Sequence, residues 1–196
     1  LGIGFFAVLW LLRSYSVDFC LRTLEQETQE VKENIYLQIS YIQERLEMAA
    51  DVIGEEEEIT SEPVFEILKS NTDMDMVSRL GIVLPDNQIL KPDKTLANPV
   101  NGITFDELKT KAAFITNMEP DNLETDKFVL FLNVTIEREN KPVGVLFGVI
   151  EPESLSDYFE VNIFDGNAEV FLVDAQNREL IMDTLHGEKQ KAGALE

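Results

Sequence analysis

The sequence predicts an α+β fold in which one long N-terminal helix packs on an antiparallel sheet. Apolar residues recur at steps of three or four between residues 18 and 53, a spacing typical of an amphipathic helix. Two apolar runs, 128–136 and 143–150, flank a short polar break, which is the pattern of a β-hairpin. A strand–turn–strand pattern at 80–90 recurs near 168–182 and predicts that a second, partial unit begins before the chain ends.

Composition and charge narrow the class of protein. The chain has 196 residues, of which 44% are hydrophobic, enough for one core or two small modules. The net charge of −21 argues against nucleic acid or an anionic membrane surface as a partner of the folded part, and solubility explains it more simply. With one cysteine, Cys20, and one histidine, His186, the chain has no internal disulfide and no Cys/His zinc site, so we expect no metal or cofactor.

Residues 1–12 are uncharged and apolar, which predicts contact with a membrane. Twelve residues are too few to span a bilayer, so we interpret 1–17 as the end of a transmembrane helix, with Trp10 and Tyr15 at the headgroup level. A signal-peptide core and a buried helix of a soluble protein are the alternatives. The membrane interpretation is favoured because no polar face begins before Arg13.

Residues 18–57 are interpreted as a stalk that continues from the membrane segment. A helix over this stretch would reach on the order of 50 Å from the bilayer. Its apolar seam suits the same helix of a second copy, which predicts a homodimer, and its upper turns suit packing on a sheet. The alternative is a core helix without a dimer role, but one small domain covers so long a helix poorly. The seam consists of Leu24, Thr28, Val31, Ile35, Ile39, Ile42, Leu46, Ala49 and Ile53.

Short elements separated by turn signals fill residues 58–160 and predict one module. Thr104 and Glu107 form a capping-box pattern at the start of one of its helices. Helices are expected at 64–70, 104–112 and 152–159. Strands are expected at 77–84, 88–90, 114–118 and in the two runs of the hairpin, with loops at 92–102 and 119–126. Residues 161–196 hold the start of the second unit, with strands at 168–174 and 178–182, followed by a tail.

Polar residues on apolar strands are the candidates for a binding site. Arg79 lies among apolar strand residues and would need an anion if it were buried, because an unpaired buried charge is costly. The alternative is an exposed Arg79 paired with Asp73 or Asp75.

Further candidates lie on the strands expected at 114–118 and 128–136. Asn133 and Thr135 share one side of their strand with Phe131, while Thr116 and Asn117 close the preceding strand. The alternative for Asn133 and Thr135 is a solvated strand end. The candidate ligand-binding residues are therefore Arg79, Thr116, Asn117, Phe131, Asn133 and Thr135.

Four segments together resemble the Cache superfamily, the PAS-like extracytoplasmic sensors of bacterial membrane receptors. They are the apolar segment running into a long helix, RLGIVLPDNQIL, the hairpin VLFLNVTIERENKPVGVLFGVIEPESL, and the restart AEVFLVDAQNRELI. The resemblance implies a five-stranded antiparallel sheet with the long helix on one face and a small ligand on the other. It also implies a double-Cache sensor, with 58–160 as the membrane-distal module and 161–196 as the start of the second.

The family further implies a membrane location, with residues after about 17 outside the cytoplasm, and an output domain that lies outside this chain. A diguanylate cyclase is the favoured output, and a histidine kinase or a chemoreceptor is the alternative. Amino-acid-binding members carry an Asp in the last strand of the sheet, where this sequence has Val149. We therefore expect no amino-acid pocket of that kind.

Two other classes of function remain open. An enzyme with a carboxylate pair would need acids with raised pKa values, whereas Glu151 and Asp174 fall at strand ends, where carboxylates are commonly solvated. No catalytic residue is expected in this chain. A non-binding spacer or dimerisation domain would instead have a sheet face filled by its own side chains.

Overall fold

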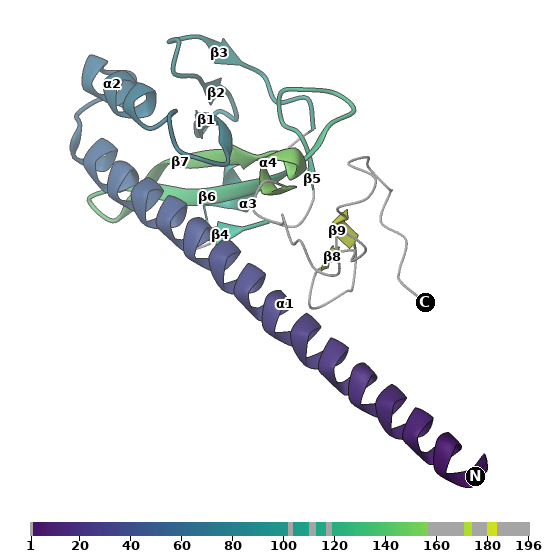
Figure 1. Cartoon of the computed structure of the whole chain (residues 1–196). Coiled ribbons are helices and arrows are strands. Elements are labelled where there is room, and N and C mark those ends of the chain that lie inside the picture. The colour runs from purple at the N-terminus through teal and green to yellow at the C-terminus, as the bar shows by residue number, and fades with distance from the viewer. Residues whose placement is uncertain are drawn as a thin grey trace.

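In the computed structural model, the described residues are 2–101, 104–109, 113–116, 119–156, 171–173 and 180–183. The helix α1 (Gly2–Glu55) is continuous, as the periodicity of residues 18–53 predicts, and extends well beyond the sheet as one rod (Figure 1). Among the described residues, no helix contains an apolar stretch long enough to cross a bilayer.

The upper turns of α1 pack on the sheet. Leu46 and Ile53 have no exposed surface, and Ile42 is 1% exposed. The upper part of the predicted seam is thus buried within the chain itself. Side chains of this size each contribute about 1.5–3 kcal/mol when fully buried. The buried residues of α1 are Ile35, Ile42, Leu46, Ala49, Ala50 and Ile53.

The sheet is antiparallel throughout and has the strand order β3-β2-β1-β7-β6-β4, with β5 also pairing with β6. The five strands expected from the sequence are all present. They are β1 (Val77–Val83), β2 (Ile89–Leu90), β4 (Phe114–Ile115), β6 (Phe128–Arg138) and β7 (Lys141–Ile150). Two more, β3 (Leu96–Ala97) and β5 (Glu119–Pro120), lie in segments predicted as loops. Each has only two residues, too few for a periodic signal.

The short helices follow the expected caps. The helix α2 (Glu62–Ser70) has Pro63 in its first turn. The helix α3 (Phe105–Leu108) begins after Thr104, and the capping box with Glu107 is confirmed. α3 is shorter than the predicted 104–112, of which 110–112 lie outside the described residues. The helix predicted at 152–159 is α4 (Pro152–Ser156), and residues 157–159 lie outside the described residues.

Near the C-terminus, β8 (Phe171–Val173) and β9 (Leu180–Asp183) form an antiparallel pair. This confirms the two paired strands predicted from the recurrence, while the turn predicted between them lies outside the described residues. Whether the pair opens a second module stays a prediction.

The sheet is buried on both faces, and the two faces belong to different clusters of apolar residues. The α1-facing side of the β6–β7 hairpin contributes Leu130, Leu132, Val134, Ile136, Leu146 and Ile150. The opposite side, called here the distal face, consists of Val83, Ile89, Val129, Phe131, Val145, Phe147 and Val149, with Phe105 of α3 packed on it.

Hydrogen bonds connect the C-terminal end of α1 to the turn end of the β6–β7 hairpin. Arg138 donates from Nε to the carbonyl oxygen of Gly54 over 3.3 Å and from Nη1 to that of Glu57 over 2.8 Å. A cation that binds the last carbonyls of a helix also interacts favourably with the helix dipole. Gly54 lets the two segments touch, because a Cβ there would lie 2.3 Å from the carbonyl oxygen of Glu137.

We predict that Gly54→Ala destabilises the protein by about 2 kcal/mol through this overpacking. At an unobstructed helix position the same change would stabilise by about 0.5–1 kcal/mol, so the sign of the effect tests the contact. Urea denaturation measures it. Gly148→Ala is the matched control, because its Cβ would meet only side chains, the nearest at 3.3 Å. A Gly54→Ala protein as stable as the wild type would contradict the close approach.

Candidate ligand-binding face

The distal face holds three rows of side chains across β1, β7 and β6. Cross-strand pairing joins Arg79 to Val149 and Val149 to Phe131, which makes the first row. The next two rows run Gly81–Phe147–Asn133 and Val83–Val145–Thr135. Residues two apart on a strand share a face, so the predicted residues Arg79, Phe131, Asn133 and Thr135 are all on the distal side.

Aromatic side chains fill the middle of this face. The rings of Phe131 and Phe147 meet edge to face, with centroids 6.0 Å apart and planes at 76°. Phe147 lies over Gly81, since a Cβ at Gly81 would be 2.7 Å from the ring atom Cζ. Phe131, Phe147 and Val149 are at most 2% exposed. The centre of the distal face is therefore filled by the chain's own side chains.

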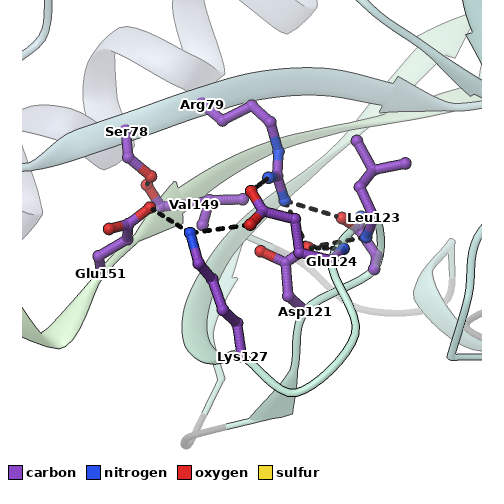
Figure 2. Close-up of polar contacts among 9 residues, drawn as sticks. Ser78, Arg79, Asp121, Leu123, Glu124, Lys127, Val149 and Glu151 are labelled. Carbon is purple, nitrogen blue, oxygen red and sulfur yellow. Dashed lines mark hydrogen bonds and ion pairs between the residues drawn. The ribbon is translucent and has the colours of Figure 1, made fainter.

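One end of the face is polar and is organised around Arg79. Its Nη2 lies 2.6 Å from Asp121 Oδ1 and 3.2 Å from Asn122 Oδ1, and its Nη1 lies 3.4 Å from Glu124 Oε1 (Figure 2). The Arg79 side chain is 21% exposed, whereas that of Asp121 is 1% exposed. This is a partly buried ion pair between β1 and the loop that joins β5 to β6, with the carboxylate as its buried member.

The loop folds around the carboxylate of Asp121. Its Oδ1 also accepts hydrogen bonds from the backbone N–H groups of Leu123, over 2.7 Å, and Glu124, over 3.2 Å. Two atoms beside it have no hydrogen-bond partner although they are buried: Asp121 Oδ2 and Arg79 Nε. A buried polar atom without a partner costs about 1–3 kcal/mol, so this acceptor and this donor are suited to a polar group from outside the chain.

Lys127 extends the ion pairs toward the end of β7. Its Nζ lies 2.8 Å from Glu124 Oε2 and 3.8 Å from Glu151 Oε1 (Figure 2). The hydrogen bond to Glu124 and the charge of Glu151 raise the pKa of Lys127 above its usual value. Charges thus alternate from Asp121 through Arg79, Glu124 and Lys127 to Glu151, which directly precedes α4.

The remaining predicted residues differ in their placement. Thr116 exchanges hydrogen bonds with the backbone of Phe131, from its own N–H over 2.8 Å and to its Oγ1 over 2.9 Å, so it holds β6 in place. Asn133 is 3% exposed and lies next to Phe147 in the pairing register. Thr135 lies two positions farther along β6 from the polar end. Asn117 lies outside the described residues.

The partner of Arg79 was not foreseen from the sequence. The alternative of an exposed Arg79 paired with Asp73 or Asp75 is wrong, because Arg79 pairs with Asp121 and Glu124. The sequence held one local signal, because an Asp that accepts from the N–H two residues on is typical of a turn. Nothing in the sequence placed that turn beside β1, more than 40 residues away. Among the described residues, no group of three His, Cys, Asp or Glu side chains could hold a metal ion.

Comparison with solved structures identifies the architecture. The ligand-binding domain of the Campylobacter jejuni chemoreceptor Tlp3, in complex with L-norvaline, matches with a TM-score of 0.60 and 20% identity over 81% of this chain and 65% of that chain. The chain therefore shares the fold of that ligand-binding domain, which is the α+β fold that the resemblance to the Cache superfamily implies. No family profile matches the sequence, and no curated protein does.

The ligand-binding domains of two other chemoreceptors match similarly. The ligand-binding domain of the Pseudomonas fluorescens chemoreceptor CtaA with L-alanine gives a TM-score of 0.62 at 17% identity, over 82% of this chain and 70% of that chain. The ligand-binding domain of the Pseudomonas aeruginosa PAO1 amino acid chemoreceptor PctB with L-Gln gives a TM-score of 0.62 at 11% identity, over 80% of this chain and 65% of that chain. The chain spans slightly less than two thirds of the Tlp3 domain's length.

We predict that Asp121→Asn lowers the free energy of unfolding by about 2 kcal/mol or more, because it leaves the Arg79 charge without its buried partner. Urea denaturation at neutral pH measures the loss. Asp73→Asn is the matched control, since Asp73 is exposed and is the partner that the sequence suggested. Equal stability of the two variants would show that the buried pair contributes nothing.

A second prediction concerns pH. A group whose pKa is raised in the folded state stabilises below its unfolded pKa, and this contribution disappears as the pH rises through the folded pKa. The difference in Tm between the wild type and Lys127→Met should therefore be constant from about pH 7 to 9 and shrink above about pH 10. Exposed Lys141→Met serves as the control. A Lys127→Met difference that persists at pH 12 would contradict an electrostatic origin.

Proposed function

We propose that this chain is the extracytoplasmic, ligand-sensing part of a membrane-bound bacterial signal transducer, with the polar end of the distal face as its ligand site. The Cache fold supports a sensory role, since the solved neighbours are sensory or ligand-binding domains of chemoreceptors. The single observation that carries the site is the pair of buried unsatisfied atoms, Asp121 Oδ2 and Arg79 Nε. We further propose that residues 1–17 are the end of the membrane anchor.

The chemistry of the two atoms defines the ligand. Asp121 Oδ2 requires a hydrogen-bond donor, and Arg79 Nε requires an acceptor. Three carboxylates and two cations form the chain of ion pairs, so the surroundings favour a ligand with a cationic or neutral donor over a simple organic acid. Small molecules that carry both a donor and an acceptor, such as hydroxylated amines or zwitterions, meet both requirements.

The amino acids bound by the neighbours have this combination of groups. In this chain, however, the buried Val149 offers no carboxylate on the distal face, so any such ligand would rely on Asp121. Arg79, Phe131 and Asn133 are the further residues that we propose to contact it, because they share the face.

The output of the transducer lies beyond these residues. A chemoreceptor fits at least as well as the diguanylate cyclase favoured by the sequence, because the solved neighbours belong to chemoreceptors. A histidine kinase is the third option. The chain itself is proposed to be non-catalytic: Glu151, one of the acids considered for an enzyme, is 34% exposed and paired with Lys127. Asp174, the other, lies outside the described residues.

One observation favours a second function, that of a spacer without a ligand. The aromatic side chains of the distal face already fill its centre, as expected for a domain that only separates or joins other parts. Binding and spacer functions differ in whether the domain gains stability from any small molecule.

We predict that a thermal-shift screen of amines, amino acids, sugars and organic acids gives a hit among compounds that carry an amine or hydroxyl donor. Titration calorimetry of that hit should show at least about tenfold weaker binding to Asp121→Asn, which corresponds to the loss of one charge-assisted hydrogen bond. Asp73→Asn should bind like the wild type. A hit that binds Asp121→Asn unchanged would place the ligand elsewhere, and uniform failure of a broad panel would favour the spacer.

A further inference from the structure

The strand β1 contains an extra residue directly before Arg79, at the polar end of the distal face. From Arg79 onward the pairs between β1 and β7 are regular and begin with Arg79 opposite Val149, but Val77 pairs with Ile150. Ser78 thus separates two positions of β1 whose partners on β7 are adjacent. Such an arrangement is a β-bulge, in which two residues of one strand oppose one residue of the other.

The extra residue is not needed for the register of the sheet or for its core. In a strand without Ser78, Val77 would directly precede Arg79 and would still lie opposite Ile150, because neighbours on one antiparallel strand pair with neighbours on the other. Side chains alternate between the faces of a strand, so Val77 would also remain on the α1-facing side, where it is buried. The bulge therefore serves something other than the packing of β1.

The ion pair between Arg79 and Asp121 extends across a strand. Asp121 directly follows β5, which pairs with β6, whereas Arg79 lies on β1, and β7 separates β1 from β6. Strands two places apart in a sheet are roughly 10 Å apart, and side chains of a regular strand stand almost perpendicular to the sheet. The guanidinium group of Arg79 nevertheless reaches the loop and lies 2.6 Å from Asp121 Oδ1 (Figure 2). Its side chain must therefore lean toward the loop.

A bulge provides this change of direction. It bends its strand and increases the local twist, and bulges beside functional sites commonly redirect a side chain. Here the extra residue directly precedes the arginine, so its effect on the direction of that side chain is as large as a bulge allows. The hydroxyl group of Ser78 also connects the bulge to β7, since its Oγ donates to the carbonyl oxygen of Val149 over 3.3 Å (Figure 2).

We propose that Ser78 is a positioning residue of the ligand site: as the extra residue of the bulge, it directs Arg79 toward Asp121 and so determines where the unpaired Nε is presented. The significance of this position rests on the proposed function, because Nε of Arg79 is one of the two atoms assigned to the ligand. The effect itself lies within the chain, so it can be measured without a ligand.

A double-mutant cycle between Arg79 and Asp121 tests the proposal. Urea denaturation compares the parent protein with Arg79→Met, Asp121→Asn and the double variant, and the coupling is the factor by which the two single effects on the unfolding equilibrium constant fail to multiply. We expect a coupling of at least about tenfold in the wild type and less than about twofold in a protein that lacks Ser78. A deletion that merely weakened the fold would shift all four proteins equally. Coupling that is unchanged by the deletion would overturn the proposal.

Two further variants separate the extra residue from its side chain and from the fold. Ser78→Ala is the matched control, because it keeps the bulge and removes only an exposed hydroxyl group, so its coupling should stay within about threefold of the wild type. An alanine inserted after Ser78 enlarges the bulge and leaves the pairs on either side in place. This insertion should also reduce the coupling below about twofold, and it provides the test if the deletion variant does not fold.

The remaining outcomes are also decisive. Loss of coupling in Ser78→Ala as complete as in the deletion, or full coupling in the insertion variant, would overturn the positioning role of the extra residue. Because the cycle contains no ligand, an unsuccessful ligand screen would count against the proposed function and leave this inference standing. A cycle that is insensitive to the bulge would reject the inference and leave the ligand site to be judged by the screen.

Discussion

The packing of α1 on the β6–β7 hairpin is the contact on which the rest of this structure depends. Leu46 and Ile53 of the helix and Leu132 and Ile136 of β6 have no exposed surface, and all belong to one core. A two-stranded hairpin is marginal in water by itself and needs a partner for its apolar side. Because α1 covers that side of the hairpin, the polar residues in the middle of β6, Asn133 and Thr135, lie on the distal face.

The end of the helix shows how this contact is fixed in register. Arg138 binds the carbonyl oxygen of Gly54 in the last turn of α1 and that of Glu57 just beyond the helix, and Gly54 allows the backbone of Glu137 to touch the helix. Both contacts come from the turn region of the hairpin, so the helix cannot slide along the sheet without breaking them. A shift of α1 would therefore move the hairpin with it, which is the mechanical coupling that the proposed sensory function requires.

The distal face combines an apolar and a charged environment. Its centre is a packed aromatic layer, whereas its end holds a chain of five alternating charges around Asp121 and Arg79. Burial makes the inner members of that chain costly to leave unpaired, and it makes any added hydrogen bond stronger than in water. The same series of ion pairs connects the β5–β6 loop to Glu151, directly before α4. A displacement of the loop would therefore alter the contacts of the segment that follows β7.

Local patterns in the sequence were enough to predict the longer helices and strands and the central hairpin, but not the two-residue strands β3 and β5. Residues 18–53 predicted one uninterrupted helix because their apolar residues keep a helical period, and the runs 128–136 and 143–150 predicted the central hairpin. Thr104 and Glu107 predicted a capped helix start, since that signal is local. The acid that pairs with Arg79 depends on long-range packing, because Asp121 lies next to β1 only when β5 and β6 position the loop. Packing also determines which apolar residues of α1 are buried. The helical period of the sequence shows that an apolar face exists, but the position of the sheet determines which face is covered.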